Sequence, residues 1–177
     1  MSEFLLLSVA IYLLVIRSRN APENGENGNG FIPPELLRDA RIMIDRLKPY
    51  QIFIDREAKK NGVDPQLVMA MIWAESSGNP NAIGDLDRPA GYQSYGLMQI
   101  TRGAAIDVGY DPNNLMDPET NIAIGVAYLA LMYAKFHAWD LAVCAYNAGA
   151  GNVEAGRTHQ KKVFKYWAAI KEVLRNA

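Results

Sequence analysis

An apolar run opens the chain, and a segment almost free of apolar residues follows it. Residues 4–16 are apolar except for Ser8 and Tyr12, whereas residues 21–30 (APENGENGNG) consist mainly of Gly, Asn and Glu. A polar, Gly-rich composition is typical of a flexible linker. We therefore expect a hydrophobic anchor or signal-like segment at residues 1–19, a linker at residues 20–30 and a folded domain at residues 31–177.

The folded part shows helical periodicity nearly throughout. Apolar positions recur every three or four residues, and Pro, Gly, Asn or Asp punctuate the repeats. The pattern predicts helices at residues 33–48, 50–60, 65–77, 102–108, 118–136, 141–147 and 159–175. Asp64, Thr101 and Asp140 stand directly before three of these helices, and we expect them to cap those helices. Few charges interrupt residues 118–136, so we expect this helix to be central and buried. Residues 79–95 have no helical period and predict a long loop with room for a short hairpin.

Glu75 lies on the apolar face of the helix predicted at residues 65–77. It shares this face with three apolar residues at spacings of three and four, Val68, Met71 and Ile72. Burial disfavours a negatively charged carboxylate, and so does the negative end of the helix dipole. We expect Glu75 to keep its proton near neutral pH, as a general acid must. The alternative is a carboxylate at the edge of the face that reaches solvent.

Composition narrows the classes of function. The net charge is −1 and no long basic run occurs, which argues against binding to nucleic acid. The single cysteine, Cys144, excludes an internal disulfide. With two histidines and no cysteine cluster, we expect no zinc or other metal site and no cofactor.

Three short segments carry candidate chemistry: residues 75–76 (ES) at a helix end, residues 96–100 (GLMQI) and residues 145–149 (AYNAG). In this order and at these spacings they closely resemble the catalytic domain of lytic transglycosylases of the soluble type, whose fold is similar to goose-type lysozyme. The resemblance covers about residues 50–175. It implies a mainly α, lysozyme-like helical domain with one long loop or short hairpin by the active-site cleft.

The resemblance implies cleavage of the β-1,4 bond between N-acetylmuramic acid and N-acetylglucosamine in peptidoglycan. Glu75 matches the family's sole catalytic acid/base. It would protonate the glycosidic oxygen and then take the proton of the sugar's own C6 hydroxyl, which leaves a 1,6-anhydromuramic end without using water. One carboxyl group suffices for this chemistry, unlike the carboxylate pair of most glycosidases. The expected partner is therefore a peptidoglycan glycan strand.

The resemblance also implies substrate-binding roles for five further residues: Ser76, Met98, Gln99, Tyr146 and Asn147. Met98 is expected to line the sugar cleft by apolar contact and Gln99 by its amide. The Tyr146 hydroxyl is expected near Glu75 and the substrate acetamido group. Ser76 either orients Glu75, contacts sugar or ends the helix, and Asn147 either binds sugar or holds a turn.

The chain departs from the family near its C-terminus. Members carry a Tyr-Val pair after the third motif, with the tyrosine facing the cleft. Aligning the last helix places His159 near that position, whereas matching by residue type selects Tyr166, and the sequence leaves both open. Tyr92 and Tyr95, in or near the long loop, are candidate platforms for sugar rings.

Two other functions compete on the same fold. A goose-type lysozyme would need a second carboxylate to direct water, and Asp85 or Asp87 could supply it, although both also look like turn residues. A catalytically silent peptidoglycan-binding module would need the sugar contacts but no buried acid. A housekeeping enzyme, a secretion-machine accessory and a phage-encoded protein would share these features.

Residues 1–19 admit three interpretations: a signal peptide, a short membrane anchor or a buried helix. A helix of 13 residues reaches ~20 Å, short of the ~30 Å hydrocarbon core. The start of the chain lacks the basic residues of a cleaved signal. We favour an uncleaved membrane anchor with the domain facing the cell wall, in the periplasm or, for a phage protein, at a virion membrane. Arg17 and Arg19 indicate the opposite orientation.

Overall fold

The structure is a computed structural model that describes residues 31–177, so the predicted anchor and linker lie outside the described residues. The described part is mainly helical, as predicted. Its helices are α2 (Pro34–Leu47), α3 (Gln51–Asn61), α4 (Pro65–Ser76), α5 (Arg102–Asp107), α6 (Pro118–Phe136), α7 (Trp139–Ala148) and α8 (Arg157–Arg175). The 3-10 turns are η1 (Lys48–Tyr50), η2 (Ala90–Tyr92) and η3 (Val153–Gly156). Among these residues no helix combines the length and the apolar character that crossing a membrane requires.

The predicted long loop contains a short hairpin. Strands β1 (Ile83–Gly84) and β2 (Ser94–Tyr95) pair antiparallel, with Ile83 opposite Tyr95 and Gly84 opposite Ser94. An isolated bridge between Tyr95 and Ile100 then folds residues 96–99 into a tight turn. The second predicted motif is therefore a turn attached to the hairpin.

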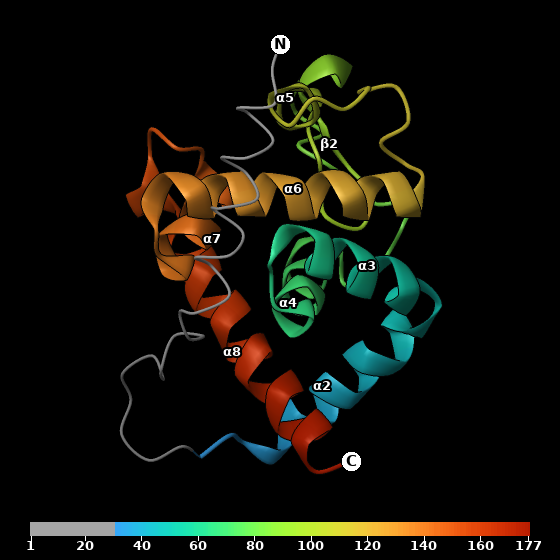
Figure 1. Ribbon diagram of the computed structural model, residues 1–177, viewed down its shortest axis with the longest axis vertical. Helices are drawn as coiled ribbons and strands as arrows, with labels where there is room; N and C mark the ends of the chain where they lie inside the picture. Colours follow the sequence, from blue (N-terminus) through green and yellow to red (C-terminus); the bar gives the residue numbers. More distant parts are fainter. Residues whose placement is uncertain (1–30) are drawn as a thin grey trace.

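Helix α4 lies at the centre of the domain (Figure 1). Helices α2, α3 and α8 pack on it, and α6 crosses above α3 and α4 in the view of Figure 1. Every residue from Leu67 to Ile72 is buried. The prediction of a single apolar face is therefore wrong for this helix, because neighbouring elements cover it on several sides. Truncating a core side chain such as Met71 to Ala is expected to cost about 2–5 kcal/mol.

Side chains cap several helices where the sequence predicted. Asp64 accepts a hydrogen bond from the Gln66 backbone N–H (2.8 Å) through one oxygen and from Trp167 Nε1 (3.1 Å) through the other. It therefore starts α4 and joins α4 to α8. Thr101 caps α5 by accepting from the Ala104 N–H (3.2 Å).

Two predicted boundaries near the C-terminus are wrong. Helix α7 begins at Trp139, so Asp140 lies in its first turn, where it pairs with Arg157 (3.2 Å) instead of capping the helix. Helix α8 begins at Arg157, two residues before the predicted start, because η3 leads directly into it. Gly156 is required at this junction, since a Cβ there would lie 2.2 Å from the Cys144 carbonyl oxygen.

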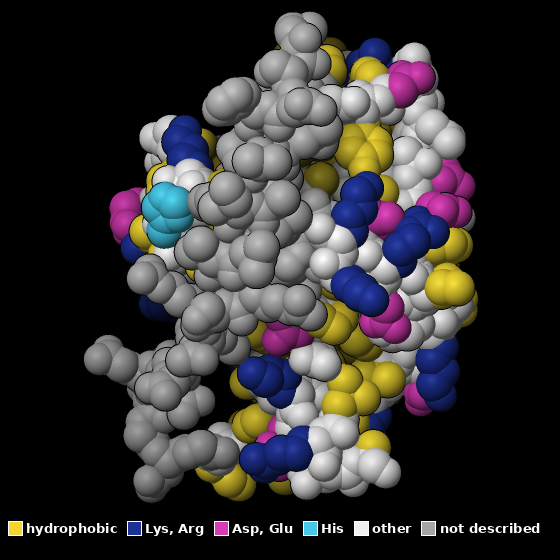
Figure 2. Space-filling model, viewed as in Figure 1, with side chains coloured by type: hydrophobic (Ala, Val, Ile, Leu, Met, Phe, Trp, Pro, Cys, Tyr) yellow, Lys and Arg dark blue, Asp and Glu magenta, His cyan; other side chains and the backbone are white. Residues whose placement is uncertain are grey.

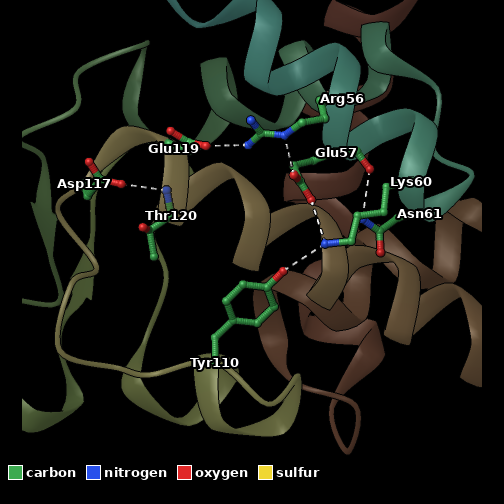
Figure 3. A network of polar contacts seen from close by, with 8 residues as sticks. All are labelled: Arg56, Glu57, Lys60, Asn61, Tyr110, Asp117, Glu119 and Thr120. Atoms are coloured by element: carbon green, nitrogen blue, oxygen red, sulfur yellow. Dashed lines mark hydrogen bonds and ion pairs between the residues drawn. The ribbon is translucent and has the colours of Figure 1, made fainter.

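A polar network fixes the position of α6 against α3 (Figure 3). Glu57 is 4% exposed and accepts from Arg56 Nε (2.9 Å) and Lys60 Nζ (3.4 Å). Arg56 also reaches Glu119 on α6 (2.9 Å), and Lys60 reaches the Tyr110 hydroxyl (3.4 Å). Hydrogen bonds from Arg56 to the two carboxylates raise the pKa of its guanidinium.

The described surface that Figure 2 shows mixes cationic and acidic side chains, which agrees with the small net charge.

Candidate active site

Glu75 occupies the last turn of α4, where the chain leaves the core. Its side chain is 12% exposed, so the carboxylate is largely enclosed but keeps a narrow opening to solvent. The helix ends at Ser77, which adopts a left-handed conformation (φ 54°). Arg46 and Lys162 donate to the backbone carbonyls of Ser77 (3.0 Å) and Ala74 (2.9 Å). These cations from α2 and α8 stabilise the negative end of the helix dipole, which holds this turn in place.

His159 is the side chain that the structure places against Glu75. Its Nε2 lies 3.1 Å from Glu75 Oε1, and the His159 side chain is 13% exposed. The contact is within ion-pair distance, although the two groups are not aligned as a hydrogen bond. Tyr166 lies about two turns further along α8, packed against the core. Of the two residues that the sequence left open, His159 is therefore the one beside the acid.

Ser76 uses its hydroxyl within the protein. The hydroxyl lies 2.8 Å from the Leu97 carbonyl oxygen and 3.2 Å from that of Ile72, and it accepts from the Gly78 backbone N–H (3.2 Å). Of the three roles left open by the sequence, these contacts favour the structural one. Ser76 joins the end of α4 to the turn at residues 96–100.

Tyr146 comes from α7 and reaches the same turn. Its hydroxyl donates to the Met98 carbonyl oxygen (2.8 Å), and its ring meets Tyr128 edge-on at 5.4 Å. Burial raises the pKa of the Tyr146 hydroxyl well above its usual value, and the charges of Glu75 and Tyr128 raise it further. The Tyr146 hydroxyl therefore stays neutral in the working pH range of a general acid.

Met98 faces inward instead of lining an open cleft, whereas Gln99 is only half-buried. Met98 is fully buried, which leaves no side-chain surface for the predicted apolar contact with sugar. The Gln99 amide donates to the carbonyl oxygens of Gly96 (2.9 Å) and Ala82 (3.2 Å) and accepts from Ser94 Oγ (2.9 Å). Both polar ends of this amide thus stabilise the hairpin from within.

Asn121 is a supporting residue that the sequence analysis missed. It is fully buried on α6, accepts from the Met98 N–H (2.7 Å), and donates to the carbonyls of Leu115 (2.7 Å) and Tyr95 (2.8 Å). Gly96 makes room for it, since a Cβ there would lie 2.5 Å from Asn121 Nδ2. The signal was present in the sequence as a single amide within the most apolar predicted helix.

A hollow of about 280 Å³ adjoins Tyr146. Its lining combines residues from the long loop, the second motif, α5 and its cap, α6 and the third motif: Arg88, Gln99, Ile100, Thr101, Ala104, Tyr128, Tyr146, Asn147, Ala148 and Gly149. Asn147 is exposed there. A second hollow of about 450 Å³ includes Tyr95 and Arg102 in its lining, whereas Tyr92 is 69% exposed. A polar hollow bordered by aromatic rings is suited to a sugar.

The acidic residues of the long loop take part in a turn. Asp85 has a left-handed backbone (φ 52°), its carbonyl accepts from the Arg88 N–H (2.9 Å), and its carboxylate lies 3.7 Å from Arg88 Nε. Asp87 is exposed. Residues 31–177 contain no group of three or more His, Cys, Asp or Glu side chains arranged to hold a metal ion.

Comparisons with known proteins agree with this arrangement. Membrane-bound lytic murein transglycosylase F of Desulfosudis oleivorans is 32% identical over 143 residues, which cover 73% of this chain and 29% of the relative. Membrane-bound lytic murein transglycosylase C of Sodalis glossinidius is 32% identical over 125 residues, which cover 61% of this chain and 33% of the relative. The chain thus spans only about three tenths of the length of these curated relatives.

Solved structures show the same fold. The 70 kDa soluble lytic transglycosylase SLT70 of Escherichia coli superposes with a TM-score of 0.62 at 28% identity, covering 71% of this chain and 24% of that one. The lytic transglycosylase Slt of Pseudomonas aeruginosa, an inactive mutant, gives a TM-score of 0.60 at 22% identity, covering 82% of this chain and 31% of that one, which supports the fold alone. The family model described as Transglycosylase SLT domain matches residues 52–168, more than half of the chain. The chain therefore belongs to the transglycosylase SLT domain family.

Proposed function

We propose that this chain is a peptidoglycan lytic transglycosylase. It cleaves the β-1,4 bond between N-acetylmuramic acid and N-acetylglucosamine and leaves 1,6-anhydromuramic ends. The observation that carries the proposal is the largely enclosed carboxyl group of Glu75 at the end of α4. This helix end contacts the second motif through Ser76, and the second motif contacts the third through Tyr146. The names of the relatives, lytic murein transglycosylases, support the same reaction.

One carboxyl group performs both proton transfers of this reaction. Glu75 gives its proton to the glycosidic oxygen as the bond from that oxygen to C1 of the muramic acid breaks. The sugar's O6 then bonds to C1, and the proton of the C6 hydroxyl passes to the Glu75 carboxylate. The protonated acid is restored and no water is consumed. General acid–base catalysis of this kind contributes roughly 10²–10⁴-fold to a rate.

We assign the substrate contacts to the hollow beside Tyr146. Asn147 is exposed in this hollow and is our candidate for direct contact with sugar. Gln99 and Tyr146 also line this hollow, while Ser76 and Met98 support it from within the fold. The Tyr146 hydroxyl donates a hydrogen bond to the Met98 carbonyl oxygen. Toward an acetamido N–H of the substrate, the same hydroxyl can therefore act only as an acceptor.

We also propose that residues 1–19 associate with a membrane and that the domain faces the cell wall. The support is the apolar run before the polar linker, together with relatives whose names describe them as membrane-bound. The orientation needs a direct test, because Arg17 and Arg19 favour the opposite one.

Product analysis tests the proposed reaction. Purified sacculi are digested with the wild-type chain and with Glu75→Gln, and the released muropeptides are weighed by mass spectrometry. The expected products end in 1,6-anhydromuramic acid and are one water lighter than hydrolysis products. Reducing ends would identify a goose-type lysozyme, and binding to sacculi without any release would identify a silent binding module.

A further inference from the structure

The contact between His159 and Glu75 is not used by the mechanism above. His159 lies on α8 and Glu75 on α4, 84 positions apart in sequence, and both side chains are nearly enclosed. Nε2 of His159 is buried and has no hydrogen-bond partner with good alignment, so its nearest polar neighbour is Glu75 Oε1 at 3.1 Å. A buried ring nitrogen this close to the candidate acid calls for a chemical role.

The neighbours of this pair do not change their charge in the relevant pH range. Arg46 on α2 and Lys162 on α8 donate to backbone carbonyls at the end of α4, and both side-chain types stay cationic where carboxylates and imidazoles titrate. Tyr146 on α7 stays neutral, since burial and the charge of Glu75 raise the pKa of its hydroxyl. Carboxyl and imidazole groups are the side-chain types in this cluster that can exchange protons near neutral and mildly acidic pH.

We propose that His159 is a positioning residue that shares a proton with Glu75. The inference rests on the proposed role of Glu75 as the acid. With one proton in the pair, either the Glu75 carboxyl group faces a neutral ring nitrogen, or a carboxylate faces an imidazolium. Transfer of the proton across the contact between Oε1 and Nε2 interconverts the two forms. Cleavage removes this proton, and the C6 hydroxyl returns one to Glu75.

Sharing the proton raises the pH at which the pair of side chains releases it. Two groups that can each hold the same proton release it at a higher pH than either group alone. The tyrosine that the family resemblance led us to expect at this position could donate a hydrogen bond to Oε1, but it would not take up a proton near neutral pH. His159 therefore extends the active range of this chain towards higher pH.

The pH profile of His159→Gln tests the proposal. The amide nitrogen of Gln can occupy the place of Nε2 and donate to Oε1, but it cannot carry the proton. Initial rates of product release at low substrate concentration follow kcat/KM and report the free enzyme. The midpoint of the alkaline limb should move to lower pH, by about 0.3 unit if the two groups hold the proton equally and by more if the ring holds it longer. His159→Tyr should recover the rate to within about tenfold of wild type while keeping the lowered midpoint.

The second histidine provides the matched control. His137 is exposed and ends α6 with a left-handed backbone (φ 55°), which Asn tolerates. His137→Asn should keep the wild-type midpoint. A purely structural role for His159 would lower the rate equally at every pH, so an unchanged midpoint in His159→Gln would overturn the proposal. If Glu75→Gln were still active, the proposed function itself would fail, and the two failures are thereby distinguished.

A titration by NMR gives a readout that needs no activity. The ring signals of His159 are followed against pH in the wild-type chain and in Glu75→Gln, and His137→Asn assigns them. Removal of the carboxylate should make the His159 ring lose its proton at a lower pH, because the ion-paired form no longer exists. Identical titration curves in the two proteins would also overturn the proposal.

Discussion

Asn121→Ala tests most directly the hydrogen bonds that hold the second motif in place behind the site. The substitution removes the partner of three backbone groups, the Met98 N–H and the carbonyls of Leu115 and Tyr95. The Tyr95 carbonyl keeps a second donor, the Ile100 N–H at 2.9 Å. The Met98 N–H and the Leu115 carbonyl are therefore the two buried groups that lose their hydrogen-bond partner. Since each such group costs about 1–3 kcal/mol, the free energy of unfolding should fall by about 2–6 kcal/mol.

Such a loss is a large part of the 5–15 kcal/mol by which a typical domain is stable. The measurement is the denaturant midpoint of the full chain followed by circular dichroism, with the slope checked for constancy. The melting temperature should fall by at least roughly 4 °C, because one kcal/mol shifts it by about 2–4 °C at this domain size. Asn81→Ala, at an exposed asparagine, is the matched control and should change stability by less than about 0.5 kcal/mol.

Asn121→Asp separates hydrogen bonding from shape. The carboxylate has the size of the amide and can accept from Met98, but it cannot donate to both carbonyls and would bury a charge. It should therefore destabilise the domain at least as much as Asn121→Ala. A loss below about 1 kcal/mol in the Ala variant, or a milder effect of Asp than of Ala, would refute the assigned network.

Four further variants test other parts of the proposal. Glu75→Gln should keep the fold and sacculus binding but lower turnover at least about 100-fold, because the amide has no acidic proton to give to the glycosidic oxygen. A smaller loss in the product assay would show that Glu75 is not the acid. Asp85→Asn and Asp87→Asn should each lower the reaction rate by less than about 10-fold, or ~1.4 kcal/mol of barrier, since Asp85 has a role in its turn. A large loss of rate together with reducing ends in the products would indicate a lysozyme. A chain that starts at Phe31 should stay active on sacculi and lose membrane association in flotation assays, and an inactive product would place the first segment in the core. Protease accessibility in sealed membranes would decide the orientation.

The start of a helix could be predicted from the sequence where a capping residue directly precedes an apolar-periodic segment. Asp64 and Thr101 stand directly before apolar-periodic segments, and both cap the helix that follows. Asp140 failed as a signal, because an acidic residue is also favourable inside the first turn, where it interacts with the helix dipole. Its partner, Arg157, lies in another helix and could not be inferred from local pattern.

Residue type in a motif does not tell which way a side chain points. Ser76 and Gln99 were expected at the sugar because they can form hydrogen bonds, yet they bond to backbone carbonyls brought close by the fold. The place of His159 beside Glu75 is likewise a long-range contact, which neither periodicity nor motif spacing could select over Tyr166.

The contacts of the second motif explain why polar residues surround a buried methionine. The Leu97 carbonyl accepts from Ser76 on α4, the Met98 N–H donates to Asn121 on α6, and the Met98 carbonyl accepts from Tyr146 on α7. Three helices thus hold two consecutive residues by their backbone, at distances of 2.7–2.8 Å.

This frame fixes the last turn of α4 from one side, while His159 and the cations Arg46 and Lys162 fix it from the other. A catalytic group must be held within about 0.5 Å of its productive position by residues that are themselves locked. Because the Glu75 turn has partners on α2 and α8 as well as on the hairpin turn, its position depends on long-range packing of the domain. In the proposed mechanism, the polar residues of the motifs therefore first hold Glu75 in place, and Asn147, Gln99 and Tyr146 at the hollow are the candidates for contact with sugar.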